Sequence, residues 1–456
     1  MMRFLRVLFL LLMANNTFAN IVLPSVFSDH MVLQQNEIVS LWGWANPSEE
    51  ITIKPSWTDE VFKTKANNQA KWELKIKTPG YGGPYSILIK GFNEIVLNDI
   101  LIGEVWLCSG QSNMEMSASW GITNMSEIEK ANNSNIRFFN IPKISAETVQ
   151  NNVMANWEVC SPEVMKKSSA VAYFFAKRLQ ENLKSVPVGL IVSAWGGTPA
   201  ETWMSEETVK TDRILDTAAN KLTPVQWGPI EPGRAFNAMI NPIAGYNLAG
   251  VLWYQGEANV GSEVYDKTLE ALIISWRHLW KKDFPFYLVQ IAPFNYGKDN
   301  FDGVAIRNAQ RKVADRVENT EMVVISDIST IDDIHPKNKK SVGERLANLA
   351  LKKHYEVLNS LVESPSFSVV EFRENKAILF FKYGNDLYIK TKNSLFEIAG
   401  DDKIYYTAKA TIKNNVVTLR TKKVIRPKFV RFAWSNTASS NLFNSVHLPV
   451  SSFTTE

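Results

Sequence analysis

Cysteine is scarce in this chain: 456 residues contain only Cys108 and Cys160. At most one disulfide can form, so the fold is not a small scaffold held together by several disulfides. A chain of this length can bury a core without such a bond. An oxidising compartment would permit the single disulfide, and two buried thiols are equally compatible with the sequence. Both states of the pair stay open.

The chain also has little net charge, +4 at neutral pH. Two of the basic residues, Arg3 and Arg6, lie in a short N-terminal leader, and without them the net charge falls to +2. Binding to nucleic acid depends on a basic surface that neutralises phosphates, and so small a surplus does not provide one. We therefore expect no nucleic-acid partner.

Long apolar runs are missing as well, since none reaches the roughly 20 residues that a membrane-spanning helix needs. The longest one near the N-terminus, residues 7–13, follows Arg3 and Arg6 and precedes a small-residue exit that ends at Ala19. This arrangement is typical of a secretory signal peptide over residues 1–19. We expect cleavage near Ala19, no membrane span, and a periplasmic or secreted protein.

Apolar patterning divides the rest of the chain into three regions. Residues 20–98 contain short alternating runs separated by Asn, Pro and Gly turns, which is typical of a small β-sandwich domain. In residues 99–355 apolar strands alternate with longer helical patterns, which favours parallel βαβ units and the α/β class. Short strand-like runs return in residues 356–456 and predict a C-terminal β-rich domain.

The middle region provides the candidate functional residues. Its predicted strands cover residues 100–108, 188–194, 250–254, 286–291 and 322–327, and its last helix residues 339–354. In an open parallel sheet, the loops that follow the carboxyl ends of the strands face one common crevice. The residues that follow each strand are therefore expected to meet at one edge of the sheet.

Ser112 is the candidate nucleophile at this edge. It follows the first strand and Gly110, so it can occupy a tight turn with an exposed hydroxyl and a backbone N–H free to bind an oxyanion. The turn lacks the second glycine of the G-x-S-x-G motif, and a serine after glycine is more often an ordinary turn residue. A serine hydroxyl needs a neighbouring imidazole as its base. Of the five histidines, only His335 lies in a loop on this edge, which makes it the predicted base.

An orienting carboxylate should fix the tautomer of the imidazole. Asp332 lies three residues before His335, a spacing that lets its carboxylate reach Nδ1 while Nε2 faces the serine. The adjacent Asp333 is the rival for this role, and we prefer Asp332.

Attack on an ester also produces an oxyanion, which needs preorganised donors. The expected donors are the backbone N–H groups of Ser112 and Gly197, together with a side-chain amide from Gln255 or Asn259. Glu257 lies between these two amides. It would position the amide or line the substrate pocket, or it would be a solvated loop charge.

At these residues the sequence resembles the sialate O-acetylesterase family within the SGNH hydrolases. The matching segments are residues 23–35 (LPSVFSDHMVLQQ), 105–114 (VWLCSGQSNM), 195–204 (WGGTPAETWM), 235–242 (AFNAMINP), 253–259 (WYQGEAN), 284–293 (FPFYLVQIAP) and 333–337 (DIHPK). They are spread over most of the chain. The resemblance implies a three-layer α/β/α SGNH-type hydrolase domain with a parallel sheet, flanked by β-rich N- and C-terminal regions. It implies no metal or other cofactor.

The resemblance also implies an activity, the hydrolysis of O-acetyl esters on sialic acids or other acetylated sugars by a serine esterase. Carried over to this chain, Ser112 and His335 match the nucleophile and base, and Gly197 and Gln255 match the oxyanion positions. The contribution of Asn259 stays open, and the orienting Asp varies within the family. Two alternatives remain: an esterase acting on acetylated xylan or another polysaccharide, and a non-catalytic carbohydrate-binding surface protein. The intact serine and histidine argue against the second.

Overall fold

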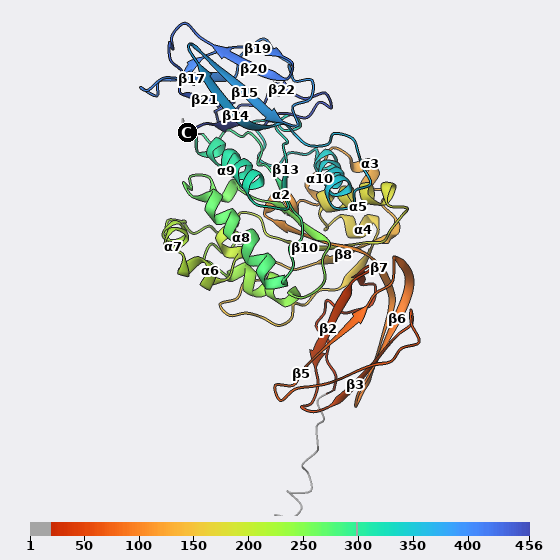
Figure 1. The fold of residues 1–456 in the computed structure, drawn as a ribbon. Coiled ribbons are helices and arrows are strands. Elements are labelled where there is room, and N and C mark those ends of the chain that lie inside the picture. The colour runs from red at the N-terminus through yellow and green to blue at the C-terminus, as the bar shows by residue number, and fades with distance from the viewer. Residues whose placement is uncertain (1–19, 298–299) are drawn as a thin grey trace, which may run out of the picture.

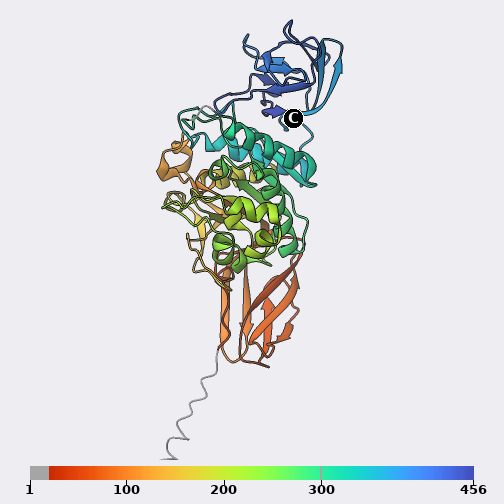
Figure 2. The same cartoon turned by 90° about the vertical axis from the view of Figure 1, so that its left-hand side faces the viewer.

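The computed structural model describes residues 20–297 and 300–456. The predicted signal peptide, residues 1–19, lies outside the described residues. Three regions follow one another along an elongated molecule, with a β domain at each end and an α/β domain between them (Figures 1 and 2). Among the described residues, no helix combines the length and the apolar character needed to cross a membrane.

A twisted sheet forms the centre of the middle domain. Its strands lie in the order β13-β12-β11-β7-β10-β8-β9. Their bounds are β7 (Glu94–Gly110), β8 (Asn133–Asn140), β9 (Trp157–Cys160), β10 (Val188–Ala194), β11 (Gly250–Tyr254), β12 (Phe286–Val289) and β13 (Thr320–Val323). Neighbouring strands are parallel except for β8 and β9. Every residue of β10 and β11 is buried, as expected for apolar strands that are covered on both faces.

Helices cover both faces of this sheet (Figure 1). α5 (Ala170–Asn182) packs against α10 (Lys339–Lys353) on one face, and α8 (Tyr265–Trp280) packs against α9 (Asp302–Arg316) on the other. The two helix pairs contribute to separate hydrophobic cores, one on each side of the sheet. The three-layer α/β/α class implied by the resemblance is therefore confirmed.

The structure also contains elements that the apolar pattern did not predict. β8 and β9 extend the sheet, although β8 begins with the polar run Asn133–Asn135. α9 has only a weak apolar stripe because several of its buried residues are polar, among them Arg307, Gln310 and Arg311. An element whose buried side chains are polar lacks the apolar periodicity by which a helix or strand is predicted from sequence.

Two small sheets build the N-terminal domain. One pairs β2 (Ile38–Trp44) with β5 (Lys71–Lys77). The other joins β7 to β1 (Val32–Gln34), β3 (Glu50–Pro55), β4 (Phe62–Lys65) and β6 (Gly82–Lys90). The first part of β7 pairs with β6, and its last part pairs with β10 and β11. The predicted domain boundary at residues 98 and 99 therefore lies inside one continuous strand.

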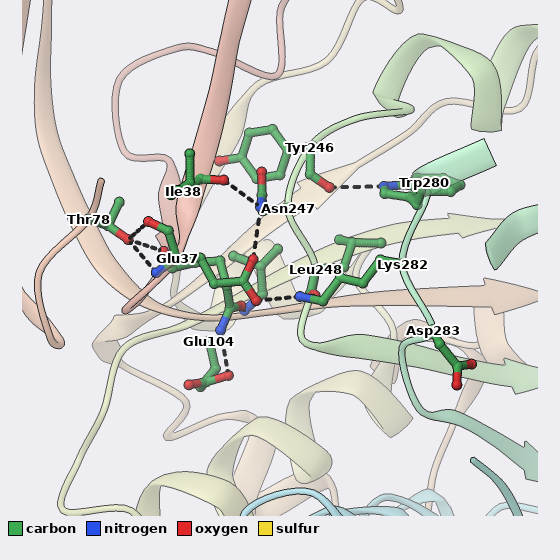
Figure 3. Close-up of polar contacts among 12 residues, drawn as sticks. Glu37, Ile38, Thr78, Glu104, Tyr246, Asn247, Leu248, Trp280, Lys282 and Asp283 are labelled. Atoms are coloured by element: carbon green, nitrogen blue, oxygen red, sulfur yellow. Dashed lines mark hydrogen bonds and ion pairs between the residues drawn. The ribbon is translucent and has the colours of Figure 1, made fainter. Parts of the chain in front are cut away.

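Polar contacts fix the N-terminal domain to the middle domain (Figure 3). The carboxylate of Glu37 accepts a hydrogen bond from the amide of Asn247 at 2.9 Å and forms an ion pair with Lys282. Asn247 also donates to the carbonyl of Ile38, and Lys282 donates to the carbonyl of Leu248 at 2.8 Å. Asn247 lies in the loop before β11 and Lys282 in the loop after α8. The contacts therefore hold these two loops against the N-terminal domain.

The C-terminal domain has its own hydrophobic core. Its main sheets have the orders β14-β15-β20-β19 and β18-β17-β21-β23, and a two-stranded sheet pairs β16 with β22. The bounds are β14 (Ser366–Arg373), β15 (Lys376–Lys382), β16 (Tyr388–Ile389), β17 (Phe396–Ala399), β18 (Tyr406–Thr407), β19 (Lys409–Lys413), β20 (Val416–Arg420), β21 (Phe429–Phe432), β22 (Leu442–Phe443) and β23 (Phe453–Thr454). The Asn436 side chain accepts hydrogen bonds from the N–H groups of Gly303 and Val304, so this domain caps the start of α9.

The two cysteines are free and buried. Cys108 lies on β7 and Cys160 at the end of β9. Burial raises the pKa of the Cys160 thiol to about 12, so it stays protonated at neutral pH. Of the two states that the sequence left open, the structure has the pair of buried thiols.

Candidate active site

Ser112 occupies a tight turn at the carboxyl end of β7. Gly110 ends the strand with a φ of +132°, and a Cβ there would lie 2.2 Å from the carbonyl oxygen of Tyr254. Glycine therefore allows β7 and β11 to approach at the point where the chain turns. Ser112 is the first residue of the short helix α2 (Ser112–Glu115), so its N–H has no acceptor within the helix. This N–H is available as an oxyanion donor.

His335 reaches this serine from the loop between β13 and α10. Its Nε2 lies 2.9 Å from Oγ of Ser112, although the two residues are 223 positions apart. Burial lowers the pKa of the half-buried imidazole below its usual value, and the neighbouring Lys339 ammonium lowers it further. The ring is therefore neutral at neutral pH, as a general base must be before it accepts a proton. The Trp120 ring packs edge-on against it, with 5.6 Å between the ring centroids.

The two candidate orienting carboxylates have different surroundings. Oδ1 of Asp333 accepts a hydrogen bond from the backbone N–H of His335 at 2.8 Å, and its charge raises the pKa of the imidazole. Asp332 is exposed and, within residues 20–297 and 300–456, makes no hydrogen bond to His335. The preference for Asp332 stays a prediction, and the geometry favours Asp333.

Gly197 presents the second backbone donor. Its φ is +77°, and a Cβ would lie 2.1 Å from the Trp227 ring, so both the conformation and the space require glycine. The preceding N–H, of Gly196, donates to the Glu115 carboxylate at 2.7 Å. The Gly197 N–H donates to no other described residue, which leaves it free for an oxyanion.

Gln255 lies directly after β11, as the sequence predicted, but its amide is already engaged inside the protein. Its side chain is fully buried, and its amide donates to Oδ1 of Asn259 at 2.7 Å and to the carbonyl of Thr198 at 3.2 Å. Its Oε1 accepts a hydrogen bond from the Tyr265 hydroxyl at 2.8 Å. An amide nitrogen has two hydrogens, and both are used. In this arrangement the Gln255 amide holds Asn259, and the expectation that Gln255 donates directly to the oxyanion stays a prediction.

Asn259 has an amide hydrogen that is not already donated within the protein, unlike Gln255. Its Oδ1 accepts from Gln255 and from the N–H of Ala200, and its Nδ2 donates to the Glu201 carboxylate at 2.9 Å. The second Nδ2 hydrogen has no acceptor among the described residues, and Asn259 is one of the residues that line the active-site cavity. Glu201 is buried, and burial raises its pKa. Of the two amides left open by the sequence, Asn259 is the one suited to direct donation.

Glu257 belongs to a buried polar cluster behind the serine. Its Oε1 accepts a hydrogen bond from Nδ2 of Asn113 at 2.7 Å, and burial raises its pKa. Oδ1 of Asn113 accepts from the ammonium of Lys339 at 2.6 Å. Glu257 is therefore not a solvated loop charge. Sequence reasoning missed Asn113 and Lys339; the position of Asn113 directly after Ser112 was the one available signal.

The serine and histidine open into a cavity of about 1220 Å³. This exceeds the roughly 300–1,000 Å³ of most small-molecule pockets, so it has room for much more than an acetyl group. The Trp120, Trp195 and Trp227 side chains line it, and Trp227 is 57% exposed. Exposed indole faces are suited to packing against the apolar face of a sugar ring.

Comparisons with known proteins show the family to which the chain belongs. Residues 102–352 match the model of a family described as carbohydrate esterase, sialic acid-specific acetylesterase. Human sialate O-acetylesterase is 30% identical over 82% of this chain and 79% of its own length, and the rat protein is 26% identical over 82% and 81%. The crystal structure of a carbohydrate acetylesterase from Xanthomonas citri has 31% identity and a TM-score of 0.86, covering 96% of this chain and 99% of that one.

Proposed function

Because the chain belongs to the carbohydrate esterase family of sialic acid-specific acetylesterases, we propose that it removes acetyl groups from O-acetylated sialic acids through an acyl-enzyme on Ser112. It is a carboxylic ester hydrolase, like the other members of that family. The observation that carries the proposal is the 2.9 Å contact between Oγ of Ser112 and Nε2 of His335, both of which line a cavity large enough for a sugar.

The reaction follows from this contact. His335 takes the hydroxyl proton as Oγ of Ser112 attacks the acetyl carbonyl carbon. The N–H groups of Ser112 and Gly197 and the amide of Asn259 hold the oxyanion. The intermediate collapses, and His335 gives the proton to the departing sugar oxygen. Water, activated by the same imidazole, then releases acetate and restores the serine. A carboxylate from the Asp332–Asp333 pair orients the ring.

The lining of the cavity supports an acidic sugar. Arg213 and Lys221 border it, and neither forms an ion pair with an acidic side chain among the described residues. The third cation, Lys143, is paired with Glu115 at 2.8 Å. Arg213 and Lys221 are both exposed, so the carboxylate of a sialic acid could pair with them, whereas acetylated xylan has no such group on its xylose units. Arginine is particularly suited to recognising a carboxylate.

Acetate release, measured side by side on O-acetylated sialic acid and on acetylated xylan, tests the proposal. We expect a higher kcat/KM on the sialic acid, and no release by Ser112→Ala. Release confined to xylan would leave the mechanism intact and change the substrate. A fully active Ser112→Ala protein would refute the mechanism itself.

We also propose that the protein is exported, either to the periplasm or beyond the cell. Arg3 and Arg6 followed by the apolar residues 7–13 support this. The mass of the mature protein, recovered from its expressing cells, should correspond to cleavage near Ala19. An intact N-terminus would contradict it.

A further inference from the structure

We propose that Asn113 is a positioning residue that ties the turn carrying Ser112 to the loop carrying His335, and that the buried side chains of Glu257 and Lys339 hold it in place from either side. This inference rests on the proposed function, because it concerns how the same serine and histidine are brought together.

The contacts of Asn113 join the two halves of the site. The residue directly follows Ser112 and is fully buried. One hydrogen of its Nδ2 is donated to the carbonyl of Ile334 at 2.9 Å, and Ile334 directly precedes His335. The other is donated to Oε1 of Glu257 at 2.7 Å. One short side chain therefore connects the neighbours of both reacting residues.

Lys339 occupies the remaining hydrogen-bonding position. It is the first residue of α10, and it donates to Oδ1 of Asn113 at 2.6 Å while its ammonium lies 5.1 Å from the centroid of the Tyr254 ring. Burial lowers its pKa to about 7, and the charge of Glu257 opposes that shift. Side chains of this kind are rarely buried without a partner.

An amide is the group that this place requires. It presents hydrogens to the Glu257 carboxylate and to a carbonyl, and it presents an oxygen to the Lys339 ammonium. A carboxylate at position 113 would meet another carboxylate and would have no hydrogen to donate. An alanine would leave the buried carboxylate and ammonium without their hydrogen bonds. The residue type is thus fixed by the charges on either side.

The cluster also acts on the base. The positive charge of Lys339 lowers the pKa of His335, as does Lys337, while Asp333 and Glu115 raise it. Replacing Lys339 with methionine should therefore raise the pKa of the imidazole. The exposed Lys337 is the matched comparison, because water screens its charge.

The first test compares kcat and KM for Asn113→Ala and Asn113→Asp on p-nitrophenyl acetate, which has no sugar. A misplacement of about 1 Å can cost about 100-fold in rate. We expect a loss of this order in kcat for both variants, with little change in KM. Asn140→Ala is the control: its amide donates to Ser168 at 2.8 Å, and it does not line the cavity. Wild-type kcat in a folded Asn113→Ala protein would overturn the proposal.

Glu257→Gln keeps the shape of its side chain and covers the case in which Asn113→Ala does not fold. It should lower kcat, and Asn113→Ala combined with Glu257→Gln should be no slower than Asn113→Ala alone, because Glu257 acts through Asn113. Full turnover in Glu257→Gln, or losses that multiply in the double variant, would contradict the inference.

The pH dependence of kcat/KM gives a readout that a loss of packing alone would not change. In Lys339→Met the acid limb should move to higher pH, and in Lys337→Met it should move less. An unchanged acid limb in Lys339→Met would show that the charge of Lys339 does not lower the pKa of His335.

Ser112→Ala distinguishes failure of the proposed function from failure of the positioning role of Asn113. If that variant keeps its activity, the proposed function fails, whereas an inactive Ser112→Ala beside a fully active Asn113→Ala overturns only the positioning role.

Discussion

Replacing Asn259 by alanine should damage catalysis more than replacing Gln255. Asn259→Ala removes the side-chain amide of a cavity-lining residue, one of whose hydrogens has no acceptor among the described residues. Loss of one oxyanion donor typically costs about 100- to 1,000-fold in turnover, or roughly 2.7–4 kcal/mol. Because the bond to the oxyanion forms fully only in the transition state, the loss should appear in kcat and much less in KM.

Gln255→Ala should lower stability and have a smaller effect on turnover than Asn259→Ala. Both of its amide hydrogens are donated inside the protein, so its removal leaves the carbonyl of Thr198 and the hydroxyl of Tyr265 without these hydrogen bonds. Each buried polar group left unsatisfied costs about 1–3 kcal/mol of stability. We expect a lower melting temperature than in the wild type, and a smaller fall in kcat than in Asn259→Ala, because Gln255 acts by holding Asn259.

The assay is steady-state hydrolysis of p-nitrophenyl acetate, with thermal unfolding of each variant measured in parallel. Combining the two substitutions should lower kcat little beyond Asn259→Ala alone, because Gln255 acts through Asn259. A larger loss of kcat in Gln255→Ala than in Asn259→Ala would refute this reasoning and return the direct role to Gln255.

Further predictions concern the nucleophile, the base, its orienting carboxylate and the substrate. Ser112→Ala should fold normally and lose nearly all hydrolysis, which a matched circular dichroism spectrum and an acetate assay would check. Activity should rise with pH as His335 loses its proton, with a midpoint below the usual value of about 6.5 because burial lowers its pKa, and His335→Ala should lack this limb. Asp333→Asn should lower kcat more than Asp332→Asn, and both less than His335→Ala; the reverse order of the two Asp variants would restore the preference for Asp332. Arg213→Ala should raise KM for O-acetylated sialic acid but not for acetylated xylan, and equal effects on both would argue against a carboxylate contact.

The edge of the sheet could be predicted from sequence because the strands are continuous apolar runs. The predicted strands 188–194 and 250–254 coincide with β10 and β11. Parallel strands place the loops that follow them together, so Ser112 and His335 could be paired although they are far apart in the chain.

The choice between Gln255 and Asn259 could not be made in the same way. It depends on which amide hydrogens are already donated elsewhere, and therefore on Thr198 and Glu201, which belong to another loop. The role of Lys339 could not be predicted from sequence either, because it also depends on packing between distant segments. A lysine at the start of a helix is normally solvated, and only the packing of α10 behind the serine turn buries this one.

The continuity of β7 bears on how the protein unfolds. One end of this strand pairs with β6 of the N-terminal domain and the other with β10 and β11, so the two domains share a strand. We expect the two domains to melt as a single cooperative unit, while the C-terminal domain, with its separate core, can melt in a transition of its own. Since β7 ends two residues before Ser112, activity during heating should be lost together with the sandwich.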